Sequence, residues 1–288
     1  MRDLRIGPFI AGKARSPPGE PHVRGAGGGA PDRAADDGSA QPLQALLGAS
    51  APLVSGVRAQ ADRRVTRRPA VKWAMGHELR VTEIFYSLQG ETRTVGWPTV
   101  FVRLTGCPLR CHYCDTAYAF QGGERMAPDM ILEKVGAYSP RFVTVTGGEP
   151  LAQPAILPLL QTLCDRGYEV SLETSGALST AAVDPRVSVV LDLKTPGSGE
   201  SSRNLYANVD WLRAADQVKF VITNAEDYEW ARDTVEKFEL AARCDVLFSP
   251  VHGGLEAGTL ADWILRDRLP VRFQIQLHKV LWGDARGR

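Results

Sequence analysis

The feature that most restricts the fold of this chain is a regular alternation, from residue 75 onward, of short β-branched segments with segments of helical periodicity. Strands are predicted at 79–86, 99–104, 142–145, 169–172, 187–193, 217–222, 246–249 and 272–275, and helices at 128–138, 154–166, 225–242 and 259–267. Apolar strands that alternate with helices pair in parallel, and the helices cover the sheet. A complete eight-unit barrel takes about 250 residues, so this α/β segment predicts a partial barrel or an open sheet.

Residues 1–74 have a composition that cannot build a hydrophobic core. They contain 14 Ala, 10 Gly and 8 Pro but only two aromatic residues, Phe9 and Trp73. Such a segment buries too little apolar surface to offset its chain entropy, so we expect a disordered low-complexity extension at 1–74 and a folded domain at 75–288. Three interpretations stay open: a disordered tail, an organelle-targeting peptide, or sequence upstream of a true start at Met75.

The charge and cysteine content exclude several classes of protein. The formal net charge is +1, which gives no indication of a surface for nucleic acid. No run approaches the roughly 18 apolar residues that a membrane span needs. Five cysteines in a chain of 288 residues are too few for a disulfide framework. We therefore expect a cytoplasmic protein whose partners include neither nucleic acid nor a membrane.

Three of the cysteines form one short motif, Cys107-Pro-Leu-Arg-Cys111-His-Tyr-Cys114, directly after the strand predicted at 99–104. Loops at the carboxyl ends of strands carry the chemistry of α/β folds. Three thiolates on one loop suit either an iron–sulfur cluster or zinc. A structural zinc site needs a fourth ligand, which His112 or a distant cysteine would have to supply. Three thiolates alone favour a cluster with one open iron.

A second motif, Thr146-Gly-Gly148-Glu149-Pro150, follows the strand predicted at 142–145. Its glycines permit close approach of a ligand to the backbone, and its carboxylate suits an ammonium group. Together with the C-x3-C-x2-C spacing, this motif resembles the radical S-adenosylmethionine superfamily. The resemblance implies a partial (β/α)6 barrel, a [4Fe-4S] cluster on Cys107, Cys111 and Cys114, and S-adenosyl-L-methionine as the ligand of the open iron.

Upstream, Leu88-Gln89-Gly90-Glu91 and then Arg103 extend the likeness, and residues 83–275 resemble the 7-carboxy-7-deazaguanine synthase family. The resemblance implies a carbon–nitrogen lyase of queuosine biosynthesis. Its substrate would be 6-carboxy-5,6,7,8-tetrahydropterin, which it converts to 7-carboxy-7-deazaguanine with loss of ammonia. It also implies a flavodoxin or ferredoxin as the electron donor, a homodimer, and no catalytic side chain beyond the cofactor radical.

The resemblance assigns individual residues to three sites. The substrate site would contain Leu88, Gln89, Gly90, Glu91, Arg103, Thr146 and His278. The S-adenosylmethionine site would contain Tyr113, Asp115, Gly148, Glu149, Thr174, Asp192, Lys194 and Ser249. Thr116 would bind Mg²⁺ through its hydroxyl, since magnesium often takes only one or two protein ligands.

Several alternatives to these assignments remain at this stage. Arg103 could instead form a salt bridge at the rim of a barrel, and Thr116 could cap a helix. The family often has serine at the position of Asp192. Residues 274–279 alternate like a strand, which would bring His278 to the substrate. Two other functions are also open: an activase that places a glycyl radical on a partner enzyme, and a non-catalytic module stabilised by zinc.

Overall fold

The computed structural model describes residues 78–288. The disorder expected for 1–74 and the start expected at Met75 concern residues outside this range. Among residues 78–288, no helix is both long and apolar enough to span a membrane.

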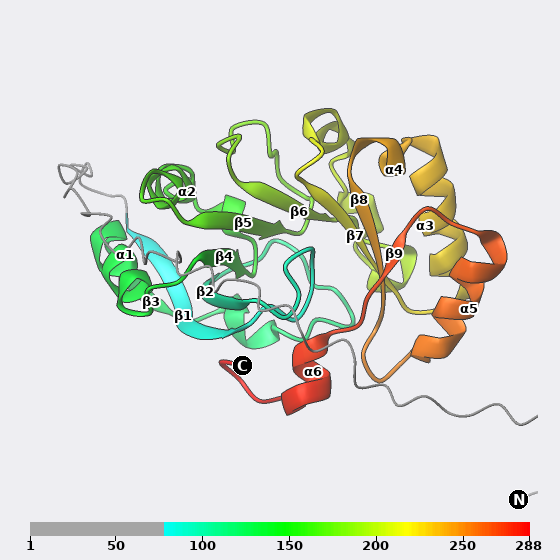
Figure 1. The fold of residues 1–288 in the computed structure, drawn as a ribbon, viewed down its shortest axis with the longest axis horizontal. Helices are drawn as coiled ribbons and strands as arrows, with labels where there is room; N and C mark the ends of the chain where they lie inside the picture. The colour runs from blue at the N-terminus through cyan, green and yellow to red at the C-terminus, as the bar shows by residue number, and fades with distance from the viewer. Residues whose placement is uncertain (1–77) are drawn as a thin grey trace, which may run out of the picture. The chain divides into compact units, whose positions relative to one another are not determined.

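One nine-stranded sheet forms the centre of the described residues (Figure 1). Its order is β3-β1-β2-β4-β5-β6-β7-β8-β9. The strands are β1 (Leu79–Leu88), β2 (Pro98–Leu104), β3 (Glu124–Met126), β4 (Phe142–Gly147), β5 (Glu169–Thr174), β6 (Ser188–Asp192), β7 (Gln217–Ile222), β8 (Asp245–Pro250) and β9 (Arg272–Phe273). Pairing is parallel from β2 to β9, and antiparallel between β1 and its neighbours β2 and β3. Because β3 and β9 form its two edges, the sheet is open, and the partial barrel is confirmed.

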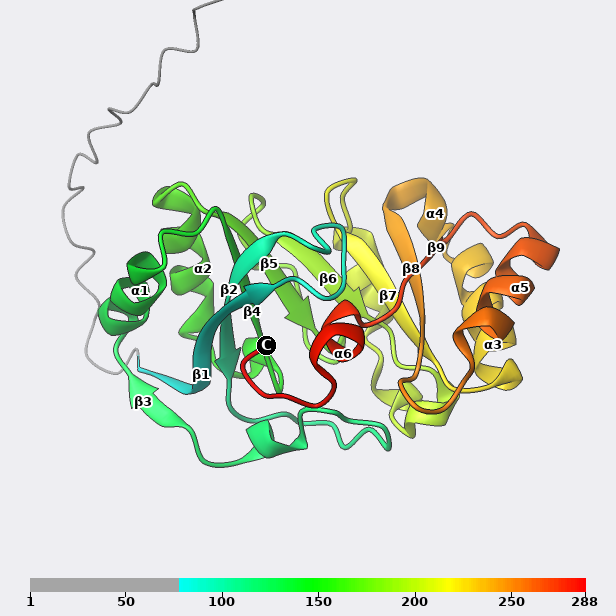
Figure 2. The same ribbon diagram turned by 60° about the horizontal axis from the view of Figure 1, so that its bottom comes forward.

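The helices are α1 (Pro128–Ala137), α2 (Ile156–Asp165), α3 (Ala225–Lys237), α4 (Leu240–Arg243), α5 (Ala257–Asp267) and α6 (Leu277–Trp282). Pro128 begins α1, where its missing N–H is tolerated. The Asn224 side chain caps α3 by accepting from the Asp227 N–H. Helices α1 to α5 lie along the outside of the curved sheet, and α6 lies on the inner side (Figure 2). Only turns and 3-10 segments connect β5 to β6 and β6 to β7, so the six units are incomplete.

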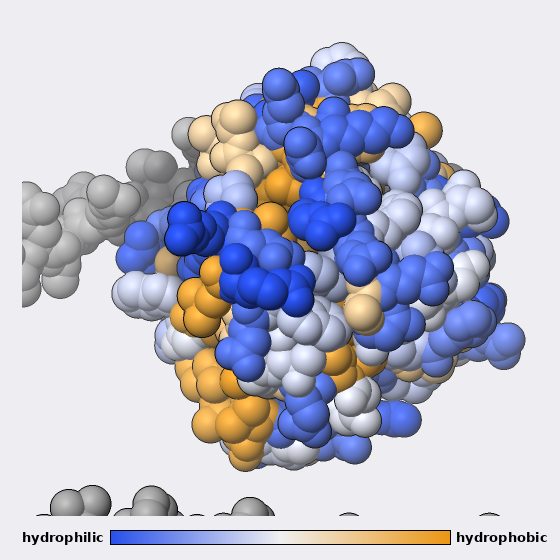
Figure 3. Space-filling model, turned by 90° about the vertical axis from the view of Figure 1, so that its right-hand side faces the viewer, coloured by the Kyte–Doolittle hydropathy of each residue, from blue (hydrophilic) through white to orange (hydrophobic). Residues whose placement is uncertain are grey.

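The hydrophobic core holds the outer helices against the sheet. Ile131 of α1 and Leu160 of α2 are fully buried, in one cluster with strand residues such as Val145 and Leu191. The surface on the α5 side of the molecule is mainly hydrophilic, with separate apolar patches (Figure 3). This core leaves the inner face of the sheet free to carry polar side chains.

Three elements differ from the sequence predictions. The helix predicted at 225–242 is interrupted at Glu239, whose φ of 50° ends α3 and separates it from α4. The three-residue edge strand β3 was not predicted. The strand predicted over 272–275 and the alternation over 274–279 are wrong beyond Phe273. The Gln274 N–H still donates to the Phe248 carbonyl of β8, and the chain leaves β8 after it. The Leu277 N–H instead donates to the Gly90 carbonyl, and α6 begins.

Candidate functional site

A cavity of about 430 Å³ opens on the inner side of the sheet. It is lined by the ends of strands β1, β2 and β4 to β8, by the cysteine loop, and by α6 with the residues that follow it. Every site residue predicted from the sequence lines this cavity except Glu149. The sheet therefore brings together residues that are up to 190 positions apart, from Leu88 to His278.

The cysteine loop leaves the carboxyl end of β2 and lies against the glycines that follow β4. The Gly148 N–H donates to the Leu104 carbonyl, and the Glu149 N–H donates to the Gly106 carbonyl at 2.7 Å. A Cβ atom on Gly148 would lie 2.0 Å from the Gly106 oxygen and 3.0 Å from the Cys107 Cβ. Only glycine allows this approach, which holds the cysteine loop over the strand ends.

The three thiols have the chemistry that an iron–sulfur cluster needs. Cys107, Cys111 and Cys114 are free, partly buried and open to the same cavity. Burial raises the pKa of Cys111 to about 11 and raises that of Cys107, so a cationic metal centre would be needed to hold these thiolates. His112 is not among the cavity-lining residues and packs against Gly199 instead. Over residues 78–288, no three His, Cys, Asp or Glu side chains meet closely enough to hold a single ion.

Glu149 is fully buried, and its carboxylate links the ends of β4 and β5. It accepts hydrogen bonds from the Thr174 hydroxyl, from the N–H and hydroxyl of Ser175, and from the Leu151 N–H. The carboxylate that the sequence assigns to an ammonium group is thus occupied by groups of the protein itself. Around this motif the Gly148 backbone and Thr174 reach the cavity, whereas the Glu149 side chain does not.

Asp192 ends β6 and Lys194 follows two residues later, and both line the cavity. Lys194 Nζ is 2.8 Å from Asp192 Oδ2. Asp192 Oδ1 is buried and has no hydrogen-bond partner. An ionised oxygen left unpaired in a buried position fits a ligand that supplies a hydroxyl or amine donor. The aspartate therefore suits a polar cofactor even where the family often has serine.

Glu91 and Lys219 form a partly buried ion pair next to Asp192, with Glu91 Oε2 2.7 Å from Lys219 Nζ. Burial alone would raise the pKa of Glu91, but Lys219 and a hydrogen bond from Gln276 lower it below its ordinary value. Gln276 also donates to Asp115, at 3.2 Å. Lys219 was missed from the sequence, although a lysine at an alternating position of an apolar strand was a usable signal for an inward-facing charge.

Gln89 and Thr146 converge on Glu173, a second residue that the sequence analysis did not assign. Gln89 Nε2 lies 3.3 Å from Glu173 Oε1, and the Thr146 hydroxyl donates to Glu173 Oε2 at 2.9 Å. Burial raises the pKa of Glu173, although Lys219 opposes the shift. The sequence held a signal for this residue, because Glu173 directly precedes Thr174, which the sequence assigns to the S-adenosylmethionine site.

Arg103 lines the cavity and also forms the salt bridge that the sequence left open. Its Nε atom lies 2.7 Å from Glu83 Oε1, which also accepts from the Tyr118 hydroxyl. Its guanidinium carbon lies 5.8 Å from the centre of the Phe85 ring. This packing fixes the guanidinium at the cavity wall.

Thr116 follows the cysteine loop and lines the cavity. Its hydroxyl donates to Asp115 Oδ1 at 3.1 Å. It precedes a short 3-10 segment, but its side chain makes no capping hydrogen bond there. The capping alternative is therefore not supported, and the hydroxyl is available to the cavity.

His278 reaches the cavity from helix α6 and packs on Gly90. A Cβ atom on Gly90 would lie 2.1 Å from His278 Nδ1, so glycine is required for this contact. Burial lowers the pKa of His278, despite the nearby Glu91 and Asp115 carboxylates. After α6, residues 283–288 also line the cavity, and Arg286 stacks on Tyr118 with its guanidinium carbon 4.2 Å from the ring centre.

Comparison with known proteins gives consistent results. Residues 101–197 match the model of the radical SAM superfamily. Over 213 residues the chain is 47% identical to the 7-carboxy-7-deazaguanine synthase of Chlorobaculum tepidum, covering 73% of this chain and 97% of that protein. It is 40% identical over 219 residues to the protein of the same name from Koribacter versatilis, covering 71% and 97%. The fold is similar to the crystal structure of QueE from Escherichia coli, with a TM-score of 0.58, 22% identity, and coverage of 70% of this chain and 95% of that chain.

Proposed function

Because this chain belongs to the 7-carboxy-7-deazaguanine synthase family of radical S-adenosylmethionine enzymes, we propose that it converts 6-carboxy-5,6,7,8-tetrahydropterin to 7-carboxy-7-deazaguanine with release of ammonia. It is a carbon–nitrogen lyase of queuosine biosynthesis. The observation that carries the proposal is one cavity lined both by the three thiols and by the segment Leu88–Glu91.

The family implies two cofactors, a [4Fe-4S] cluster and S-adenosylmethionine. Cys107, Cys111 and Cys114 would hold the cluster, and the Gly148 backbone with Asp192 would contact the nucleoside cofactor. When bound, these groups supply the single-electron chemistry. The protein's own part is to orient the substrate and to exclude water from the buried wall of the cavity.

On the substrate side, the proposed contacts are Leu88, Gln89, Gly90, Glu91, Arg103, Thr146 and His278. The carboxylates of Glu91 and Glu173 suit the amine and amide N–H groups of a pterin. A guanidinium such as that of Arg103 suits the substrate carboxylate. The cavity thus offers acceptors and donors for both ends of the proposed substrate.

We further propose that Mg²⁺ binds at the Thr116 hydroxyl together with oxygen atoms of the substrate. Thr116→Ala is expected to reduce the dependence of turnover on added Mg²⁺, because the protein ligand is lost while the thiols remain. The measurement is turnover over a Mg²⁺ titration. Thr259→Ala, on the exposed side of α5, is the matched control. A Thr116→Ala enzyme with the wild-type Mg²⁺ dependence would remove this residue from the proposed metal site.

Residues 75–288 are proposed as the catalytic unit, since the two relatives align over nearly their full length with about that span. A flavodoxin or ferredoxin as donor and a homodimer are also proposals, and the cytoplasmic location stays a prediction. The activase is not favoured, because the relatives are named as synthases. The zinc module is not favoured either, because the described side chains do not converge on a single ion.

The test is an anaerobic assay of the full chain with reconstituted iron and sulfide, dithionite, S-adenosylmethionine, Mg²⁺ and the tetrahydropterin, followed by mass spectrometry. We expect 7-carboxy-7-deazaguanine and ammonia in equal amounts. Formation of 5′-deoxyadenosine without that product would retain the radical chemistry but contradict the substrate, and would favour the activase.

A further inference from the structure

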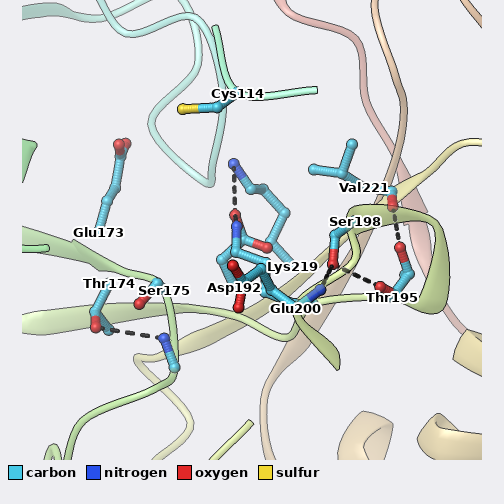
Figure 4. A network of polar contacts seen from close by, with 12 residues as sticks. Cys114, Glu173, Thr174, Ser175, Asp192, Thr195, Ser198, Glu200, Lys219 and Val221 are labelled. Atoms are coloured by element: carbon cyan, nitrogen blue, oxygen red, sulfur yellow. Dashed lines mark hydrogen bonds and ion pairs between the residues drawn. The ribbon is translucent and has the colours of Figure 1, made fainter. Parts of the chain in front are cut away.

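Lys219 is a charged residue of this cavity to which neither the motifs nor the proposed function gives a role. It lies in the middle of β7, between buried Val218 and Phe220, and its side chain turns to the cavity. Its ammonium is 2.7 Å from Glu91 Oε2. It is also 3.7 Å from Asp192 Oδ2, and Figure 4 shows Lys219 beside Asp192. One cation therefore contacts two carboxylates, one in the segment after β1 and one at the end of β6.

The two carboxylates belong to different parts of the proposed site. Glu91 comes shortly after β1, in the segment proposed for the pterin, whereas Asp192 ends β6, in the segment proposed for S-adenosylmethionine. Glu91 also accepts a hydrogen bond from Gln276, just before α6. Lys219 thus connects the substrate side of the cavity to the cofactor side.

The carboxylates around Lys219 require a positive charge at its position. Burial lowers the pKa of a lysine, but here Glu91, Asp192 and Glu173 raise it well above the ordinary value. The ammonium and the two paired carboxylates have side-chain exposures of only 14 to 17%. Removing the cation would leave the Glu91 carboxylate without its ion-pair partner in a largely buried position, which costs more than such a pair contributes at a surface, whereas Asp192 would keep Lys194 at 2.8 Å.

Resting on the proposed function, we propose that Lys219 is a positioning residue that acts through Glu91, holding its carboxylate in the orientation that receives the pterin. Lys219 itself does not contact the substrate. The same ammonium fixes Asp192 more weakly, at the longer distance, so the main effect of its loss is on the pterin.

The experiment measures equilibrium binding of the tetrahydropterin and of S-adenosylmethionine to the reconstituted, unreduced full chain, together with kcat and KM. We expect Lys219→Met to weaken pterin binding about tenfold or more and S-adenosylmethionine binding less. In a Glu91→Gln background, where no carboxylate needs to be held, we expect the same change to alter pterin binding by less than about twofold. Lys219→Arg, which keeps the charge, should recover most of the affinity. Lys237→Met, on the exposed face of α3, is the matched control.

Three results would overturn the inference: unchanged pterin binding by Lys219→Met, an equal loss in the Glu91→Gln background, or a Lys219→Arg variant as impaired as Lys219→Met. If Lys219→Met does not fold, the comparison of Glu91→Gln with the double variant, Glu91→Gln with Lys219→Met, decides the question. In the double variant both partners of the Glu91–Lys219 ion pair are neutral. Wild-type enzyme that binds S-adenosylmethionine but not the pterin would overturn the proposed function and this inference with it. If the wild-type enzyme binds both S-adenosylmethionine and the pterin, and the Lys219 variants bind them equally well, only the inference is overturned.

Discussion

At the scale of single residues, Glu149 is fully buried and contributes to the site from outside the cavity. Its oxygens accept bonds from Leu151, Thr174 and Ser175, which join two strand ends next to the cysteine loop. The sequence motif was sufficient to place the glycines and the glutamate at the site. It could not show which way the carboxylate turns, because that depends on hydroxyl donors 25 and 26 residues further along the chain.

Glu149→Gln is expected to lower the free energy of unfolding by about 1–3 kcal/mol, because its NH2 group would replace one carboxylate oxygen and cannot accept from the donors that face it. The measurement is equilibrium unfolding in urea. Glu236→Gln, at an exposed position of α3, should change stability by no more than about 0.5 kcal/mol. Equal stability of Glu149→Gln and wild type would show that the four hydrogen bonds are not required.

His278 gives a prediction for pH. Because burial lowers its pKa below 6.5 in the folded state, the unfolded chain binds the proton more readily. Its contribution to stability is therefore fully present above pH 6.5 and is lost as the pH falls below that value. Thermal unfolding of wild type and His278→Gln between pH 7.5 and 5.5 should show a smaller pH dependence in the variant. Parallel curves for the two proteins would contradict this assignment.

At the scale of elements, the strands and outer helices follow from the sequence, whereas the elements that close the cavity do not. The run Gln274–His278 alternates like a strand, but β9 ends at Phe273 because the chain crosses to the end of β1. Glu239 breaks the predicted long helix with a left-handed φ, although no glycine marks the position. Lys219 escaped notice because the face of β7 that it occupies is set by the register of the whole sheet.

Gly90→Ala tests the contact between β1 and α6. A methyl group 2.1 Å from His278 Nδ1 must displace the histidine, so pterin affinity is expected to fall about tenfold or more while the strands remain folded. Equilibrium binding and circular dichroism measure the two effects. In Gly258→Ala, a helical position with open space, binding should be unchanged and stability equal or slightly higher. Full pterin affinity in Gly90→Ala would show that α6 can move without loss.

For the molecule as a whole, different parts of the chain form different walls of the cavity on the open sheet. The parallel strands, with the cysteine loop, form one wall of the cavity, while α6 and residues 283–288 form another without burying any α6 residue fully. Alternating strands and helices predicted this open architecture. They did not predict the covering wall, since the alternation of residues 274–279 indicated a strand and not the helix α6, although the sequence already placed His278 at the site.

Deletion of residues 277–288 should therefore abolish pterin binding while leaving S-adenosylmethionine binding within about threefold. The folded domain should remain, because the hydrophobic core lies on the other face of the sheet. Binding measurements on the reconstituted protein and a thermal melt test both parts. Loss of cooperative unfolding in the deleted protein would mean that the wall is part of the folding unit.

The hydrogen bond between Glu91 and Gln276 joins residues 185 positions apart. During synthesis on the ribosome, Glu91 and the cysteine loop emerge long before Gln276 is made. The first strands and the three thiols are therefore present before the wall of the cavity that Gln276 and α6 provide. The cavity is completed late in folding, only after both residues of this hydrogen bond have left the exit tunnel.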